Sequence, residues 1–374
     1  MSQPLDGVKV LDFSTLLPGP LCSLLLADAG AEVIKFERPG RGDEMRSYEP
    51  KVDVDSANFV MLNRGKQSVA IDLKSPDTLA RLTPLIREAD VLIEQFRPGV
   101  MERLGLGFAS LAEINPRLIY CSITGFGQHG PRATEAAHDL NYVAASGMLS
   151  LTAGKDGAPV LPPALIADIA GGTYPAMINI LLALRQRDRT GSGVHLDIAM
   201  ADNLFTFQYW GLGNGALGAW PGTASELVTG GTPRYQIYRT ADGAFLAAAP
   251  LEDKFWENFL RLVGLDANAM ARLSPAQAIE SVAGAISQHP AAYWEDRFAG
   301  QDVCTSRVVS LEEARHAPHF LERGVFSRTV TTAQGAAMPA LPTPIAPAFR
   351  DKDEARQAPA LGAHNAMLDR KGLT

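Results

Sequence analysis

The first ~200 residues alternate short β-rich runs with helical patterns, and this alternation limits the folds open to the chain. Strands are expected at 8–14, 31–37, 67–73, 90–96, 118–124 and 193–199. Helices are expected at 20–30, at 76–88 and from about Leu165 to Gln186. Strands that alternate with helices form a mostly parallel sheet with helices on both faces. We therefore expect a large domain with a Rossmann-like α/β architecture.

The region between about 225 and 330 differs from the part before it. A hairpin is expected around the turn Ala241-Asp242-Gly243, followed by amphipathic helices at 252–263 and 274–287. These features predict a second, smaller α+β domain at 225–330, after a large domain at 1–224. The Pro-rich segment 338–349 is expected to be an extended linker or return segment.

The composition is typical of a globular enzyme, with 46% hydrophobic and 20% charged residues in 374. A formal net charge of -7 argues against nonspecific nucleic-acid binding, which depends on clustered Lys and Arg. The most apolar window, around Pro175 to Leu184, is shorter than a bilayer span, so no membrane partner is expected. The N-terminus MSQPLDGVKVL has no basic or long apolar region, so we expect no signal peptide and a cytoplasmic location.

Several chemical motifs are expected to be structural. The three cysteines lie in apolar stretches and are expected to be buried thiols in a reducing compartment; they are Cys22, Cys121 and Cys304. His316 and His319 lack a Cys or carboxylate partner at a metal-ligand spacing, so no metal is expected. Gly213 to Gly218 fit GxGxxG but follow a helical run, which predicts a flexible loop and no dinucleotide site.

Two segments about thirty residues apart carry a histidine and a carboxylate: AHDLNY contains His138 and LIADIAGG contains Asp168. Each residue alone has an ordinary explanation, since a histidine before an apolar run is usually structural and Asp168 is suited to cap a helix. Together, two such groups with different pKa values can remove a proton from one face of a carbon and return one to the other. The pair is the candidate catalytic centre.

Arg38 and Arg97 each follow an expected strand and precede Pro-Gly. Parallel sheets bind ligands at the carboxyl ends of their strands, where RPGRGD, RPGV and GFGQHGP fall. Arginines at such positions suit phosphate groups. Because the same strand-Arg-Pro-Gly unit occurs twice, an anionic ligand site is favoured over two ordinary surface arginines.

Motifs along nearly the whole chain resemble the family III CoA-transferases and α-methylacyl-CoA racemases of the CaiB/BaiF type, which share one fold. They are LDGVKVLDFSTLLPGPLCSLLLADAGAEVIKFERPGRGDEMR, LNRGKQSVAIDLKS, ADVLIEQFRPGVMERLGLG, LIYCSITGFGQHGP, AHDLNYVAASG, ADIAGGTYPAMINILLAL, GSGVHLDIAMADNL and APALGAHNAMLDRKGL. The resemblance implies that 331–374 returns to the large domain. It also implies an interlocked homodimer, an acyl-CoA thioester substrate and a role in lipid metabolism, with no cofactor apart from the CoA of the substrate.

The resemblance further implies which residues contact CoA. One group matches family CoA contacts and the other matches the segment along the pantetheine and thioester. They are Arg38, Ile71, Asp72, Leu73, Lys74, Gln95, Phe96, Arg97 and Arg103, and then Ala137, Asp139, Leu140, Asn141 and Tyr142. His129, in GFGQHGP, lies beside this expected site, but its position alone does not show a contact with CoA.

The two branches of the family differ at the catalytic positions. In the transferases the residue that matches Asp168 is a nucleophile that forms covalent intermediates. The racemases add a histidine at the position of His138 and a glutamate at the position of Glu252. A run of glycines over the aspartate in formyl-CoA-type transferases is reduced here to Gly230 and Gly231. These features favour the racemase branch, with a CoA-transferase as the alternative and an inert CoA-binding protein as a third interpretation.

For a racemase, His138 and Asp168 are expected to flank the α-carbon of the thioester and to exchange the roles of base and acid. Burial must then raise the pKa of the Asp168 carboxyl, while Glu252 orients His138. Backbone amides near Asp168 or at the start of its helix are the expected donors to the enolate oxygen. An adaptable acyl-binding surface could come from three methionines that are more often core residues; they are Met148, Met177 and Met200.

Overall fold

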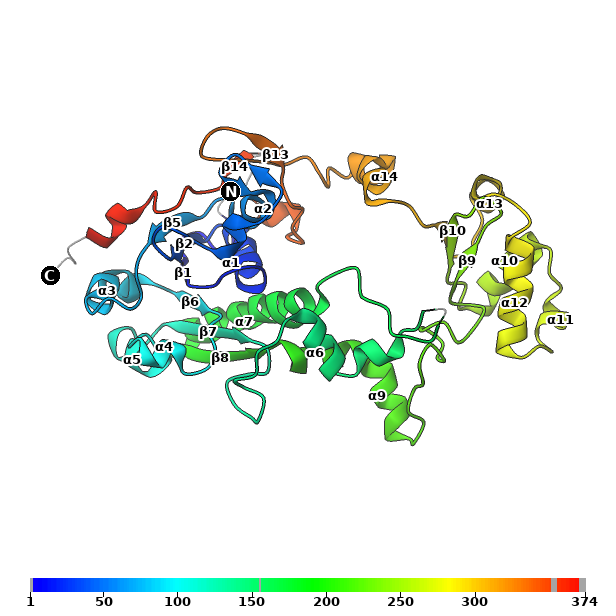
Figure 1. The fold of residues 1–374 in the computed structure, drawn as a ribbon, viewed down its shortest axis with the longest axis horizontal. Coiled ribbons are helices and arrows are strands. Elements are labelled where there is room, and N and C mark those ends of the chain that lie inside the picture. Colours follow the sequence, from blue (N-terminus) through cyan, green and yellow to red (C-terminus); the bar gives the residue numbers. More distant parts are fainter. Residues whose placement is uncertain (1–2, 155, 351–354, 370–374) are drawn as a thin grey trace. The chain divides into compact units, whose positions relative to one another are not determined.

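The computed structural model describes residues 3–154, 156–350 and 355–369, and the chain divides into two compact units (Figure 1). The larger unit comprises Met1–Ser146, Pro162–Phe207 and Pro318–Thr374. The smaller unit comprises Gly147–Leu161 and Gln208–Ala317. Compared with the predicted domain 225–330, the smaller unit also contains 147–161 and 208–224, and it does not contain 318–330. The two segments are joined directly, since the amide of Ala224 donates to the carbonyl of Leu151 at 3.1 Å.

The larger unit is built on a six-stranded sheet in the order β5-β2-β1-β6-β7-β8. Every neighbouring pair of strands is parallel. The strands are β1 (Lys9–Asp12), β2 (Glu32–Glu37), β5 (Gln67–Ala70), β6 (Val91–Glu94), β7 (Ile119–Thr124) and β8 (Val194–Ala199). All of them lie inside the runs predicted from the sequence, so the expected parallel α/β sheet is confirmed.

Helices pack on this sheet because its strands are apolar along most of their length. Leu11, Ile34 and Leu92 of the strands share one buried cluster with Leu82 and Ile86 of α3. Helix α1 is buried along its whole length and packs on β1, β2, β6 and α7. The helices of this part are α1 (Pro18–Asp28), α2 (Ala57–Asn63), α3 (Thr78–Glu88), α4 (Val100–Arg103), α5 (Phe108–Ile114), α6 (Asp139–Ala145), α7 (Tyr174–Thr190), α8 (Met200–Asn203) and α15 (Pro318–Glu322), with 3₁₀ turns η1 (Glu44–Ser47) and η4 (Leu204–Gln208).

The helix predicted over 165–186 starts as a π-helical segment, η3 (Ala167–Thr173), and continues into α7. It ends at Gly191, whose φ of 77° is the left-handed conformation that glycine adopts without strain. The continuous helix Ala167–Thr190 has 24 residues and a mean hydropathy of 1.3 in its most apolar window. By length and composition it could cross a membrane, so the prediction of too short an apolar segment was wrong. Half of that window is buried inside the protein, as in the core helix of many globular domains.

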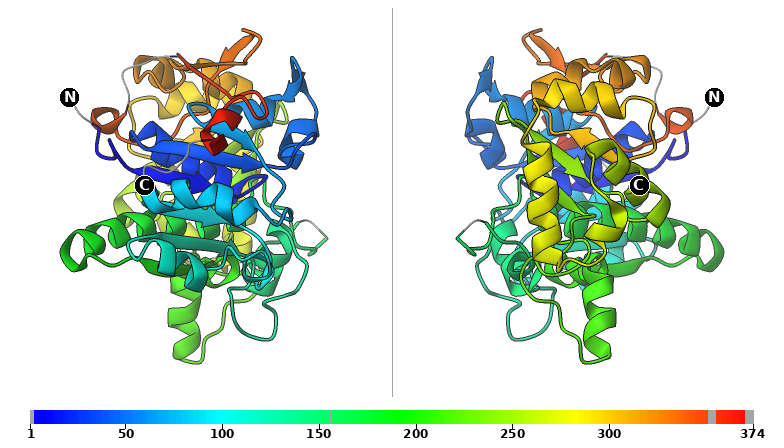
Figure 2. Two further views of the ribbon diagram at one scale, coloured as in Figure 1. Left: turned by 90° about the vertical axis from the view of Figure 1, so that its left-hand side faces the viewer. Right: turned by 90° about the vertical axis from the view of Figure 1, so that its right-hand side faces the viewer.

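The end of the chain packs on the edge strand β5. The amide of His364 donates to the carbonyl of Ser68 at 2.9 Å, and Asn365 Oδ1 accepts from the amide of Ala70 at 2.7 Å. The last 3₁₀ turn, η6 (Asn365–Asp369), therefore lies beside β5 (Figure 2). A separate sheet in the order β13-β12-β14 precedes it; its strands are β12 (Thr329–Thr331), β13 (Ala337–Pro339) and β14 (Ala355–Gln357). A small β3 (Lys51–Val52) and β4 (Asp55–Ser56) ribbon and the turn η5 (Pro347–Phe349) complete the unit.

The smaller unit combines a three-stranded antiparallel sheet with helices. Its strands are β9 (Gln236–Arg239), β10 (Phe245–Ala248) and β11 (Thr305–Arg307), and its helical elements are η2 (Met148–Leu151), α9 (Tyr209–Ala216), α10 (Asp253–Val263), α11 (Ala267–Met270), α12 (Pro275–Ile286), α13 (Ala291–Phe298) and α14 (Leu311–His316). The predicted hairpin is present, with the amide of Gly243 donating to the carbonyl of Thr240 at 3.0 Å. The predicted loop at Gly213 was wrong, because α9 runs through it.

The cysteines differ in their surroundings. Cys22 and Cys121 are buried free thiols, as expected from their apolar sequence context. Cys304 is also free but exposed, so its predicted burial was wrong. Cys304 directly precedes β11, and the neighbouring side chain that is buried there is that of Val303.

Candidate active site

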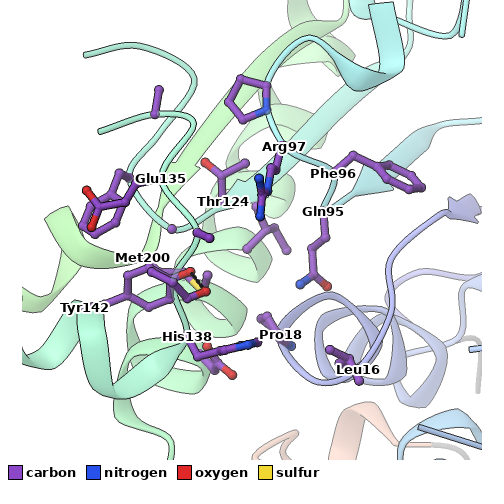
Figure 3. A pocket seen from close by; sticks show the side chains of 18 of the residues that line it. Leu16, Pro18, Gln95, Phe96, Arg97, Thr124, Glu135, His138, Tyr142 and Met200 are labelled. Atoms are coloured by element: carbon purple, nitrogen blue, oxygen red, sulfur yellow. Dashed lines mark hydrogen bonds between the residues drawn. The ribbon is translucent and has the colours of Figure 1, made fainter. Parts of the chain in front are cut away.

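A cavity of about 290 Å³ opens where the strands of the larger unit end, and it brings His138 and Asp168 together. Its wall includes the segments that follow β1, β6 and β7, as expected for a parallel sheet. The lining residues are Thr15, Leu16, Pro18, Gln95, Phe96, Arg97, Pro98, Ile123, Thr124, Gly125, Phe126, Ala133, Glu135, Ala136, Ala137, His138, Tyr142, Asp168 and Met200. In Figure 3, His138 and Tyr142 lie on one side of this cavity and Gln95 on the other.

Asp168 enters the cavity from η3, whose π-helical form is frequent at functional sites. Burial raises the pKa of its carboxyl to about 7, and the nearby carboxylate of Asp139 adds to the effect. The prediction of a desolvated aspartate is therefore confirmed. An Asp168 carboxyl with this pKa exchanges its proton near neutral pH, as an acid-base catalyst requires.

The sequence Gly171-Gly172 lets η3 pack closely on α8. A Cβ on Gly171 would lie closer than 3.0 Å to the backbone carbonyl oxygen of Met200, and one on Gly172 would be crowded by the Met200 side chain and by Pro18. Asn203 of α8 adds a hydrogen bond from its Nδ2 to the carbonyl of Gly171, at 2.7 Å. The two glycines thus allow the segment that carries Asp168 to pack closely against Met200 and Pro18.

His138 occupies the position just before helix α6, with extended backbone angles. Its backbone amide donates to Asn141 Oδ1 at 3.0 Å, which ties the start of the helix. The hydroxyl of Tyr142 donates to the carbonyl of Ala137 at 2.8 Å and holds the chain on the other side of the histidine. Tyr142 fits there because Gly125 has no side chain: a Cβ would lie closer than 3.0 Å to the ring. The backbone of Ala137 and that of His138 are therefore held by hydrogen bonds.

The loop after β1 is held by buried charges. Leu16 has a φ of 63°, a left-handed conformation that costs free energy for a residue with a side chain. Its amide donates to Asp43 Oδ1 at 3.1 Å, and Lys35 Nζ donates to the carbonyl of Ser14 at 2.7 Å. Lys35 and Asp43 are themselves a buried ion pair at 2.9 Å. This pair fixes the loop that carries Thr15 and Leu16 into the cavity wall.

A second cavity, of about 720 Å³, also has Thr15 of that loop in its wall. Three cationic side chains line it, Arg38, Lys74 and Arg103, and none of them forms an ion pair with a described acidic residue. Four acidic residues also line it: Glu37 pairs with Arg46 and Asp43 with Lys35, whereas Glu44 and Asp72 form no ion pair with a described cationic residue. Arg38, Lys74 and Arg103 are therefore free to pair with the phosphates of a nucleotide.

Phe96 and Thr15 line both cavities, so the cation-lined cavity and the His138–Asp168 cavity adjoin. An extended ligand can bind its phosphates in one cavity and place its reactive group in the other. Acyl-CoA has this form, with a phosphorylated nucleotide at one end and a thioester at the other. The two cavities together are the candidate acyl-CoA site.

The predicted contact residues divide between these cavities. Those in the cation-lined cavity are Arg38, Ile71, Asp72, Leu73, Lys74, Phe96 and Arg103, and those in the His138–Asp168 cavity are Gln95, Phe96, Arg97, Ala137 and Tyr142. Asp139, Leu140 and Asn141 line neither: Asp139 is buried behind the wall, whereas Leu140 is 41% exposed.

Other predicted residues lie elsewhere. Glu252 is exposed at the start of α10, in the smaller unit, and its contact with His138 stays a prediction. His129 lines a third cavity with His195, and this cavity shares Pro98 with the cavity of His138 and Asp168. Of the three methionines, Met200 lines the cavity of His138 and Asp168, Met177 is buried in α7 and Met148 belongs to the smaller unit.

The structure adds residues that the sequence did not point to. Thr15, Leu16 and Pro18 line the cavity because they lie in the loop that follows β1 and at the start of α1. The sequence signal that could have indicated this loop is LLPGP after a predicted strand. Thr124, at the end of β7, has a buried hydroxyl with no hydrogen-bond partner in the described part of the chain. A buried unpaired hydroxyl in a cavity wall is available to a ligand. Among the described residues, no three His, Cys, Asp or Glu side chains are grouped to hold a metal.

The chain belongs to a known class of CoA-handling proteins. The chain is a member of CoA-transferase family III, whose family model matches residues 5–365. It is 36% identical to the α-methylacyl-CoA racemase of Homo sapiens over 371 residues, 97% of this chain and 92% of that protein. It is 33% identical to the acetyl-CoA:oxalate CoA-transferase of Acetobacter aceti, over 98% of this chain and 95% of that protein. A CaiB/BaiF family protein from Brucella suis has the same fold, with a TM-score of 0.83 at 30% identity and 99% of both chains covered. The resemblance inferred from the sequence motifs is confirmed.

Proposed function

We propose that this protein is a racemase of 2-methylacyl-CoA thioesters that acts by 1,1-proton transfer at the α-carbon. The observation that carries the proposal is one cavity lined by both His138 and an aspartate whose pKa is about 7. The similarity to the human racemase supports it. The adjoining cavity with Arg38, Lys74 and Arg103 would hold the phosphates of CoA.

In this mechanism the α-carbon lies between His138 and Asp168. In one direction neutral His138 removes the α-proton, and protonated Asp168 returns a proton to the opposite face. In the other direction the ionised Asp168 is the base and protonated His138 the acid. A carboxyl with a pKa near 7 has both of its forms populated at neutral pH, as such an exchange of roles needs. No covalent intermediate forms.

The enolate oxygen needs hydrogen-bond donors while the intermediate exists. The amides expected from the sequence are occupied: that of Asp168 donates to Asp139 Oδ1 at 2.9 Å and that of Ile169 to the carbonyl of Leu165 at 3.1 Å. The first turn of α6 begins directly after His138; the amide of Asn141 there already donates to the carbonyl of His138 at 2.8 Å, which leaves the amides of Asp139 and Leu140 as candidate donors. We place the enolate oxygen at this helix start instead.

Glu252 completes the proposal as an orienting group for His138. A carboxylate that accepts from one imidazole nitrogen fixes the tautomer and raises the basicity of the other nitrogen. Replacing Glu252 by glutamine would then weaken the base without removing it. This role rests on the resemblance to the racemase branch.

The alternative is a CoA-transferase, in which Asp168 attacks the thioester carbonyl. Transferases among the relatives support it, with 33% identity for the acetyl-CoA:oxalate enzyme. The raised pKa of Asp168 does not separate the two reactions, because at neutral pH about half of the carboxyl is ionised and able to attack. His138, however, would have no role in the transferase reaction. An inert CoA-binding protein would have no use for either group.

The deciding experiment is NMR of the purified protein with one enantiomer of a 2-methylacyl-CoA in heavy water, without an acceptor acid. Loss of the α-proton signal together with inversion supports the racemase, and His138→Ala should abolish both. Exchange that persists in His138→Ala contradicts the proposed base. No exchange, followed by thioester transfer when carboxylic acids are added, would assign the protein to the transferase branch.

We also propose that the protein is a homodimer, as the family resemblance implies. Helix α7 carries four exposed apolar residues on one face, Tyr174, Ile178, Leu181 and Leu182, and Leu182 is 62% exposed. A second copy of the chain would cover this stripe. Sedimentation equilibrium should give a dimer for the native protein and a shift toward monomer for Leu182→Glu. A monomeric native protein would contradict the proposal.

A further inference from the structure

Asp139 stands between the two proposed catalytic residues without lining their cavity. It follows His138 in the chain as the first residue of α6, and its side chain is 6% exposed. Its Oδ1 accepts from the backbone amide of Asp168 at 2.9 Å, across 29 positions of sequence. One buried carboxylate thus joins the helix that begins after the base to the helix that carries the acid.

We propose that Asp139 is a positioning residue that fixes Asp168 against α6 and keeps its carboxyl able to hold a proton. The inference rests on the proposed racemase function, which it deepens. The first amides of a helix have no acceptor within that helix, so a side chain or water must satisfy them. Here the acceptor comes from α6, so any movement of η3 away from His138 would break this bond.

The charge of Asp139 acts in the same direction as burial. After burial, it is the one charge among the described groups that raises the pKa of Asp168. Four other ionisable residues line the cavity, namely Arg97, Glu135, His138 and Tyr142. Burial raises the pKa of the Tyr142 phenol to about 12, so it stays neutral at physiological pH. The residues that α1 and α8 contribute to the cavity wall, Pro18 and Met200, carry no charge.

The substitution Asp139→Asn separates these two roles. Asparagine keeps an oxygen that accepts from the Asp168 amide but removes the charge, whereas Asp139→Ala removes both. In Asp139→Asn, racemisation in the direction in which Asp168 donates should persist. This activity should fall with rising pH, and the fall should begin roughly one pH unit lower than in the native enzyme. The reason is that removing the neighbouring negative charge lowers the pKa of Asp168. Asp202→Asn, on exposed α8 surface, is the charge control and should leave the pH profile unchanged.

A second measurement separates this inference from the function on which it rests. Carboxyl ¹³C NMR of aspartate-labelled protein titrates Asp168 directly, with Asp168→Asn used to assign the signal. The pKa should fall in Asp139→Asn or, if that variant does not fold, in Asp139→Ser. A lower pKa without racemisation by the native protein would support the role of Asp139 and refute the racemase. An unchanged pKa and an unchanged pH profile in the folded variant would overturn the inference.

Discussion

Replacing Asp168 by asparagine should abolish racemisation and at the same time stabilise the folded protein at alkaline pH. The carboxyl is ionised in the unfolded chain above its ordinary pKa of 3.8, but in the folded protein its pKa is about 7. Ionisation therefore costs more free energy in the folded state. The contribution of Asp168 to the free energy of unfolding is therefore fully present below pH ~4, where the carboxyl is neutral in both states. This contribution is lost as the pH rises through about 7. Asparagine is neutral throughout and has no such loss.

The size of the effect follows from the two pKa values. A tenfold change in proton affinity corresponds to about 1.4 kcal/mol, so the ionised Asp168 costs the folded state about 4 kcal/mol above pH 7. At pH 5 Asp168 is already mostly ionised in the unfolded chain but protonated in the folded protein, and this difference lowers the free energy of unfolding by about 1.5 to 2 kcal/mol. The gain from Asp168→Asn should therefore be about 2 to 3 kcal/mol larger at pH 8 than at pH 5.

Urea denaturation followed by circular dichroism at the two pH values measures this difference. Asp188→Asn, an exposed aspartate in the last turn of α7, is a matched control and should change the free energy of unfolding by less than about 0.5 kcal/mol at both. A gain for Asp168→Asn that is equal at pH 5 and pH 8 would refute the reasoning, since the carboxyl would then not be held protonated. A loss of stability at pH 8 would refute it as well.

Three further substitutions, one of them with a matched control, test other parts of the structure. Lys74→Ala should raise KM for acyl-CoA about tenfold with little change in kcat, because it removes an unpaired cation from the ligand cavity; a fall in kcat alone in steady-state kinetics would contradict this. Gly171→Ala should lower the free energy of unfolding by about 1 to 3 kcal/mol, since its Cβ would lie closer than 3.0 Å to a backbone carbonyl of α8. Gly284→Ala on α12, where a Cβ meets nothing within 4 Å, should not destabilise in the same denaturation assay. Lys35→Met should cost about 3 to 5 kcal/mol by leaving Asp43 buried without its partner, and unchanged thermal unfolding would show that the pair is not needed.

Local patterns were sufficient for most of the fold. All six strands of the large sheet lie inside the predicted runs, and in β1, β2, β6 and β7 burial on both faces leaves a continuous β-rich signal. The hairpin turn at Gly243 was predictable for another local reason: its φ of 82° requires a residue that tolerates the left-handed conformation. Predictions failed where a local signal was ambiguous. Glycines at Gly213 and Gly215 disfavour a helix, yet α9 includes them.

The candidate site was only partly predictable. Strand-end arginines and the family motifs pointed to both cavities, because in a parallel sheet the carboxyl ends of all strands meet at one edge. The loop at Leu16 was missed, since its strained backbone depends on Lys35 and Asp43, which lie farther along the chain. The role inferred for Asp139 was missed in the same way, because its partner is 29 positions away.

The sequence by itself determined the parallel sheet, the family and the identity of His138 and Asp168 as candidates, because each depends on residues that are near one another in the chain. Only the tertiary structure decided that these two residues share a cavity, that a cation-lined cavity adjoins it, and that Asp168 has a pKa of about 7. The reason is desolvation. The water that a carboxylate loses on folding is displaced by side chains from distant segments, so its proton affinity is set by the packing of the whole unit.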